Sequence, residues 1–462
     1  MNNSDEFIYF DDYTIEDTED QDPDRYIPGP MDRIVNPNYL HESFMKCRQG
    51  VWWKSSVQRF AMNELSNIVH MINEVESGNY TLRDPYEFVL NERGHNRYIK
   101  ALAIYDRVLQ RSFNDNILNP AVLPKLIYDN GASQKGKGIA FSRARFKQHL
   151  QAAYKEFGPD GYVMFIDFSK YFDNILHELI LEQFKPLMTQ EEYDFLVITY
   201  HSFDIDISYL SSEERAHFND ALFNMLEYHE VNKELLTGEA FASKSVGIGN
   251  QTSQASGIFY CHEMDNYCKI VRGLKYYGRY MDDTYVFMKT KEELVQLFNE
   301  IEAICSKLSI HINQKKTKFI PIHAEMSYLK INYKLLPTGR VLELIPSHIF
   351  QRERHSINNF RKFWLMGKMQ NTEVLQNFLS WEGCYKHFDS KRKVYEMEIY
   401  FKDSFFIFRD TDLHELLKWQ LKYKKEMDNN RLYLERLSTK PIKYQKYDWQ
   451  SEILNKDKEK GL

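Results

Sequence analysis

The run from Gly278 to Phe287 constrains this 462-residue chain more than any other stretch, because it sets two adjacent aspartates, Asp282 and Asp283, between aromatic and β-branched residues. Such flanks are typical of β-strands, and a charged pair between them is typical of a tight hairpin turn. Side chains alternate between the faces of a strand, so neighbouring carboxylates converge only where the backbone bends. The stretch therefore predicts a hairpin with an acidic turn. Alone, such a pair would more often be an ordinary polar turn.

A third aspartate follows another strand-like segment far upstream. The apolar run 161–166 ends at Asp167, and a helix-like segment follows it. An acid at a strand end can face a cleft and share a divalent ion with acids of a neighbouring hairpin. Magnesium prefers oxygen ligands and usually keeps phosphates and water in its shell, and two ions about 4 Å apart clamp both oxygens of a phosphoryl displacement. Asp167, Asp282 and Asp283 are thus the predicted ligands of two Mg²⁺ ions, with Mn²⁺ as the alternative metal.

Three segments in this order resemble motifs A, B and C of the reverse transcriptases, which are RNA-directed DNA polymerases. They are Asp167-Phe168-Ser169-Lys170-Tyr171-Phe172-Asp173, Gly247-Ile248-Gly249-Asn250-Gln251-Thr252-Ser253-Gln254 and Tyr280-Met281-Asp282-Asp283. The resemblance extends from about residue 80 to about residue 390. It implies a right-hand polymerase of the α/β class, with fingers, a mixed α/β palm and an α-helical thumb. It further implies that the three aspartates are catalytic and that an RNA template, an RNA/DNA duplex and deoxynucleoside triphosphates are the partners.

The resemblance and the composition together suggest a division of the chain. We expect an acidic disordered arm at 1–35, N-terminal helices and fingers at 36–159, a palm at 160–345 with a helical insertion at 185–245, a thumb at 346–400 and a C-terminal helical extension at 401–462. Residues 327–340 resemble the primer-grip hairpin.

The distribution of charge and the cysteine content indicate an acidic N-terminal arm and a reducing compartment. The net charge is -6, but residues 1–30 hold ten acidic residues and one basic residue, which leaves 59 basic and 56 acidic residues in the remainder. Such an arm is typically solvated and disordered; the alternative is an acidic mimic that occupies the nucleic-acid channel or binds a basic partner. The five cysteines are scattered without metal-ligand spacing, which predicts reduced thiols in a cytoplasmic protein. No export signal or membrane segment is expected.

Further residues take roles that the resemblance implies. Arg97 matches the arginine that meets the incoming triphosphate, and its planar fork suits phosphate oxygens; His95 stands where the family usually has lysine. Phe172 matches the aromatic residue that leaves no room for a 2'-hydroxyl and thereby selects deoxynucleotides. Phe168 would offer a metal only its backbone carbonyl. Lys316 is the closest match to the motif D lysine, which can protonate the leaving pyrophosphate as a general acid.

Motif B departs from the commonest form of the family. Retroviral, retron and group II intron enzymes typically carry Pro-Gln-Gly where this chain has Gly247-Ile248-Gly249. The Ile-Gly form resembles enzymes of diversity-generating retroelements and of abortive-infection and phage-defence systems. With Ile248 in place of glutamine, a hydrogen bond that steadies the nucleotide is lost. Ile248 and Gly249 are therefore predicted to border a less constrained nascent base pair.

A basic, glycine-rich loop at 131–138 precedes a helix-like segment. Backbone amides at a helix N-terminus favour anions, so we expect template or primer contact here, with a solvated basic turn as the equal alternative. The predicted nucleic-acid-binding residues are Lys135, Lys137, Arg143 and Arg145.

Three biological settings compete. A bacterial or phage enzyme of antiviral defence, working with a cognate non-coding RNA, is favoured by the long terminal additions and by the lack of recognisable maturase, endonuclease or RNase H segments. An error-prone diversity-generating enzyme is favoured by motif B. The third is a nucleic-acid-binding scaffold that no longer polymerises; the intact set of three acids argues against it, because unused carboxylates would repel one another.

Overall fold

The computed structural model describes residues 31–92, 94–408, 412–416, 418 and 422. Most of the predicted acidic arm, and most of the predicted C-terminal extension, therefore lies outside the described residues. The chain divides into two compact units, with the break between Ile322 and His323. Among the described residues, no helix has the length and the apolar character needed to cross a membrane.

The first unit opens with short helices and a β-hairpin. The helices are α1 (Asp32–Val35), α2 (Pro37–Cys47), α3 (Ser55–Met62) and α4 (Glu64–Glu76), and the strands are β1 (Tyr86–Glu92) and β2 (His95–Ala101). Apolar residues at helical spacing, such as Phe44 and Met71, are fully buried, which is how an amphipathic helix is held in place. The antiparallel hairpin pairs Leu90 with Arg97, so these two side chains share one face.

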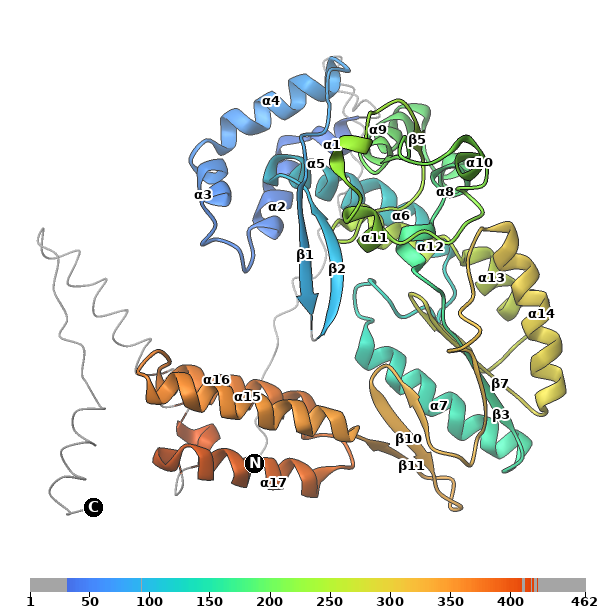
Figure 1. Ribbon diagram of the computed structural model, residues 1–462, viewed down its shortest axis with the longest axis vertical. Coiled ribbons are helices and arrows are strands. Elements are labelled where there is room, and N and C mark those ends of the chain that lie inside the picture. Colours follow the sequence, from blue (N-terminus) through green and yellow to red (C-terminus); the bar gives the residue numbers. More distant parts are fainter. Residues whose placement is uncertain (1–30, 93, 409–411, 417, 419–421, 423–462) are drawn as a thin grey trace, which may run out of the picture. The chain divides into compact units, whose positions relative to one another are not determined.

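A four-stranded sheet in the order β6-β7-β3-β8 forms the centre of this unit. Its strands are β3 (Tyr162–Ile166), β6 (Tyr277–Tyr280), β7 (Asp283–Met288) and β8 (Lys318–Pro321). Helix α7 (Ile139–Phe157) covers one face, where Phe146 contacts the rings of Phe165, Tyr285 and Phe287. Helix α14 (Lys291–Lys307) also contacts β3 and β7, and its buried Leu294, Leu297 and Ile301 belong to the same core as Met164 and Val286, which point away from α7. Figure 1 shows the sheet between these two helices.

The pairing of β6 with β7 requires a glycine at residue 278. Gly278 on β6 lies opposite Tyr285 on β7, and a Cβ at position 278 would meet the Tyr285 hydroxyl at 2.6 Å. The tyrosine ring therefore crosses the strand at a position where any other residue would clash with it.

The segments that connect the sheet are largely helical. Before β3 lie α5 (Ile104–Phe113), η1 (Asn114–Leu118), α6 (Asn119–Val122) and η2 (Leu123–Lys125). Between β3 and β6 lie η3 (Tyr171–Asn174), α8 (His177–Phe184), η4 (Lys185–Leu187), α9 (Gln190–His201), β4 (Ile205–Asp206), α10 (Ser212–Ala216), α11 (Met225–His229), η5 (Lys233–Leu235), β5 (Phe241–Ala242), α12 (Gln251–Phe259), α13 (His262–Asn266) and η6 (Tyr267–Val271). The segment at 185–245 combines short helices and loops with a small β4-β5 sheet, and it has a core of its own that includes Tyr98 of the hairpin.

The second unit combines a small sheet with three helices. Strands β9 (Met326–Tyr328), β10 (Ile331–Leu335) and β11 (Val341–Leu344) are antiparallel, and α15 (Ser347–Leu365), α16 (Asn371–Tyr385), α17 (Lys391–Ser404) and η7 (Phe406–Phe408) follow. The Asp389 amide donates to the Glu343 carbonyl at 2.9 Å, which ties the sheet to the helices. The hairpin that resembles the primer grip thus lies in the same compact unit as the helices predicted to form the thumb.

Candidate active site

The strand register brings the three aspartates to one edge of the central sheet. In the antiparallel β3–β7 pair, Ile166 lies opposite Thr284, so Asp167 and Asp283 are the next residues along each strand. Tyr280 pairs with Asp283 across the hairpin, which leaves a two-residue turn, Met281-Asp282. Two strands of a sheet lie about 4.8 Å apart. Acids separated by more than a hundred residues in the sequence therefore meet at one place.

The segment after α14 is fixed against motif A and carries Lys316. The Asn313 amide donates to the Asp167 carbonyl at 2.8 Å, and the Ser169 amide donates to the His311 carbonyl at 2.7 Å. The Lys316 Nζ lies 3.1 Å from both carboxylate oxygens of Asp167. The lysine predicted from motif D is thus in direct contact with an aspartate of motif A.

The pKa of the Asp282 carboxyl depends on the charged residues around it. Burial raises the pKa of Asp282 above its ordinary value, and the charge of Asp167 raises it further, whereas Lys316 and Arg97 act in the opposite direction. Arg97, which is exposed on β2, thus acts electrostatically on the acidic turn. Lys316 contacts Asp167, and the charges of Lys316 and Arg97 both act on Asp282; the roles predicted for these residues stay predictions.

The donor chemistry fits a divalent cation. Among the described residues, no three His, Cys, Asp or Glu side chains lie close enough together to hold a metal ion as they stand. Carboxylate oxygens are nevertheless the ligand type that Mg²⁺ prefers, and Asp167 already binds one cation, the Lys316 ammonium, with both of its oxygens. Asp167, Asp282 and Asp283 remain the predicted metal ligands.

Motif B and the residue before it are joined to the β1-β2 hairpin and to Phe172. Phe172 is half-buried on η3, and its carbonyl accepts a hydrogen bond from the Val246 amide at 3.2 Å. Ile248 forms a bridge with Ile99 of β2, so motif B joins the hairpin that carries Arg97. Gly249 has φ +119°, a left-handed conformation that favours glycine. Phe168 is buried, and its side chain therefore cannot reach a ligand in the cleft.

The four basic residues after the glycine-rich loop differ in their contacts. Arg145 donates to Asp129 at 2.6 Å, and the Lys137 ammonium donates to the carbonyls of Tyr128 and Asn130 at 2.8 and 3.1 Å. These contacts hold the side chains of Lys137 and Arg145 against residues 128–130. Lys135 is exposed, and the charge of Arg143 lowers the pKa of Tyr280 against the effect of burial. Lys135 is therefore better placed for a nucleic-acid backbone than Lys137 and Arg145.

A buried ion pair beneath the turn was missed in the sequence. Arg279 and Asp265 are both 0% exposed, and the guanidinium donates to the carboxylate from Nε at 2.9 Å and from Nη2 at 2.7 Å. Its Nη1 donates to the carbonyl of Met281 at 2.9 Å, and Met281 itself has φ +55°. The pair thus supports a strained residue of the acidic turn. An arginine inside a buried strand is a signal that could have revealed a buried charge at residue 279, although not its partner.

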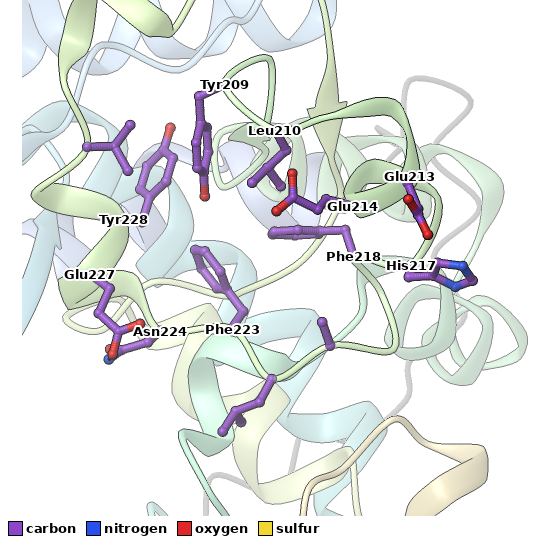
Figure 2. Close-up of a pocket in the computed structure, with 13 residues that line it drawn as sticks. Tyr209, Leu210, Glu213, Glu214, His217, Phe218, Phe223, Asn224, Glu227 and Tyr228 are labelled. Atoms are coloured by element: carbon purple, nitrogen blue, oxygen red, sulfur yellow. The ribbon is translucent and has the colours of Figure 1, made fainter.

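A hollow of about 580 Å³ lies elsewhere, in the insertion between motifs A and B. Figure 2 shows the rings of Tyr209, Phe218, Phe223 and Tyr228 around it, whereas Glu213 and His217 point away. Its described lining residues include three glutamates and no lysine or arginine. The hollow is therefore unsuited to phosphate groups and lies apart from the acidic turn.

The chain was then compared with known proteins. The sequence model of the family "Reverse transcriptase (RNA-dependent DNA polymerase)" matches residues 89–333, while the comparison with curated proteins gave no match. Similar solved structures include a Candida albicans telomerase in complex with a TWJ fragment of telomeric RNA (10% identity, 77% of this chain and 58% of that chain, TM-score 0.39). They also include an apo telomerase from Candida tropicalis truncated from its C-terminal domain (12% identity, 61% of this chain and 60% of that chain, TM-score 0.40).

This chain spans three fifths or less of the length of those telomerase chains. The family match, in contrast, covers more than half of the present chain and includes motifs A, B and C together with Arg97 and Lys316. The chain belongs to the reverse transcriptase family of RNA-dependent DNA polymerases.

Proposed function

We propose that the chain is an RNA-directed DNA polymerase, in which a primer 3'-hydroxyl attacks the α-phosphorus of a deoxynucleoside triphosphate on an RNA template. The observation that carries the proposal is the β3–β7 register, which sets Asp167 beside the acidic turn of motif C. Lys316 contacts Asp167, and the charges of Lys316 and Arg97 both act on Asp282. Catalysis of this kind depends mainly on positioning and on charge neutralisation.

Each residue has a distinct role in this proposal. Bound Mg²⁺ ions, held by Asp167, Asp282 and Asp283, would supply charge neutralisation and a more acidic attacking hydroxyl. Arg97 binds the triphosphate, because its guanidinium offers paired donors to phosphate oxygens. Lys316 holds a proton near the acids and can deliver it to the leaving pyrophosphate.

Primer extension on an RNA template in the presence of magnesium tests the proposal. We expect Asp167→Ala and Asp283→Ala to abolish extension. Asp160→Ala is the matched control, because Asp160 is an exposed acid before the opposite end of the same strand, and this variant should extend as the wild type does. Robust extension by Asp283→Ala would refute the assignment. Binding of RNA without extension by the wild type would instead favour the non-polymerising scaffold.

For the biological setting, we propose antiviral defence, in a cell where the enzyme works with a cognate non-coding RNA. The Ile-Gly form of motif B supports this setting and the diversity-generating one alike. Sequencing of cellular DNA made during phage infection separates them. A defence enzyme should yield new complementary DNA without a mutated target, whereas a diversity-generating enzyme should yield adenine-mutated copies of one specific repeat.

A further inference from the structure

The ring of Phe172 occupies space that a side chain on helix α12 would need. A Cβ built on Gly257 would lie 2.8 Å from Cζ and 2.9 Å from Cε1 of Phe172, and 3.5 Å from Sδ of Met281. Real Cβ atoms essentially never approach another heavy atom that closely. The absence of a side chain at residue 257 therefore determines how deeply the Phe172 ring can lie.

The backbones on both sides of this contact are held in place. The Gly257 carbonyl accepts hydrogen bonds from the Tyr171 hydroxyl at 2.8 Å and from Arg279 Nη1 at 3.4 Å. The Phe172 carbonyl accepts from the Val246 amide at 3.2 Å. Neither backbone can retreat without loss of these bonds, so an added methyl group at residue 257 must move the ring.

The direction of that movement follows from burial. Gly257 is buried within the first unit, whereas Phe172 is half-buried, so the ring has room to move only away from helix α12. A methyl group at residue 257 therefore pushes the ring away from α12. Under the proposed function, Phe172 packs against the sugar of the incoming nucleotide, so this displacement changes the space that the sugar has.

We infer that Gly257 is a positioning residue that sets the depth of the Phe172 ring and thereby the strength of selection between deoxyribonucleotides and ribonucleotides. The inference rests on the proposed function for its nucleotide part. The packing contact between Gly257 and Phe172 rests on the geometry alone. Two measurements can therefore distinguish a failure of this packing contact from a failure of the proposed function.

The first measurement needs no activity. We expect Gly257→Ala to lower the equilibrium constant for folding on the order of tenfold, as overpacking does. In the Phe172→Leu background, which lacks Cζ and both Cε atoms, the same change should have little effect. Gly383→Ala is the matched control, because Gly383 also lies in a helix but has open space where its Cβ would be. Equal effects of Gly257→Ala in the two backgrounds, measured by urea unfolding, would overturn the inference.

The second measurement is steady-state extension of a primer by dGTP and by GTP on one RNA template. We expect Gly257→Ala to raise the KM for dGTP on the order of tenfold and the KM for GTP further, with a smaller change in kcat. Phe172→Leu should suppress both effects. An unchanged ratio of the two KM values in Gly257→Ala, equal to that of Gly383→Ala, would overturn the nucleotide part. A wild-type chain that fails to extend with dGTP would refute the proposed function, and the unfolding measurement would still decide the packing contact.

Discussion

Replacement of Arg279 by methionine should destabilise the first unit by about 3–5 kcal/mol, because it leaves a buried carboxylate without its cation. The guanidinium gives Asp265 three charge-assisted hydrogen bonds and also donates to the carbonyls of Ile258 at 2.7 Å and Met281 at 2.9 Å. After its removal, Asp265 keeps the Tyr277 hydroxyl at 2.6 Å and a long contact to Asn130 at 3.4 Å. These neutral donors cannot compensate for a buried negative charge.

Urea unfolding of four proteins tests this reasoning: the wild type, Arg279→Met, Asp265→Leu and the double variant. Removal of both charges should be no worse than removal of one, because no ion is then left unpaired. The coupling free energy should thus be at least about 2 kcal/mol. A loss below about 1 kcal/mol in Arg279→Met, or additive losses in the double variant, would show that the pair does not support the turn.

Three further outcomes are expected. Lys316→Gln should lower kcat for extension about 100-fold and change the free energy of unfolding by less than about 1 kcal/mol, because the pair with Asp167 is partly exposed; an unchanged kcat would contradict the general-acid role. Burial raises the pKa of Asp173 to about 6. Between pH 4 and 6 the folded chain therefore keeps a proton that the unfolded chain has released, and stability falls by up to about 3 kcal/mol as the pH rises. Asp173→Asn should abolish that dependence in unfolding measured across this range. Ile248→Gln should lower misincorporation on one RNA template, and equal error spectra for the two proteins would argue against the motif B interpretation.

The sequence predicted the hairpin, the strand before Asp167 and the proximity of Lys316, because each depends on local pattern and on the order of the motifs. To predict the acidic turn, we needed only the alternation of side chains along a strand and a bend in the backbone. The structure has both, with the turn at Met281-Asp282. The mixed α/β class followed from the resemblance to the reverse transcriptases, and the structure has it. The roles of the individual aspartates and of Arg97 and Phe172 stay predictions until the variants are measured.

Other features depend on contacts that no local pattern contains. Asp265 lies 14 residues before Arg279, and nothing in either segment marks them as partners. Likewise, Lys137 and Arg145 belong to a basic run that indicates nucleic acid, yet their nearest acceptors are on the loop 128–130. The break between the two compact units at Ile322 falls within a strand-rich stretch without a linker composition, so composition could not reveal it.

The contact between Lys316 and Asp167 affects the stability of the protein when no metal ion is bound. The Lys316 ammonium offsets the negative charge of Asp167. Repulsion between the aspartates at the ends of the strands is therefore reduced even without a bound metal ion. The first unit can therefore complete its fold while divalent ions are scarce, and removal of those ions by a chelator should halt turnover without unfolding it.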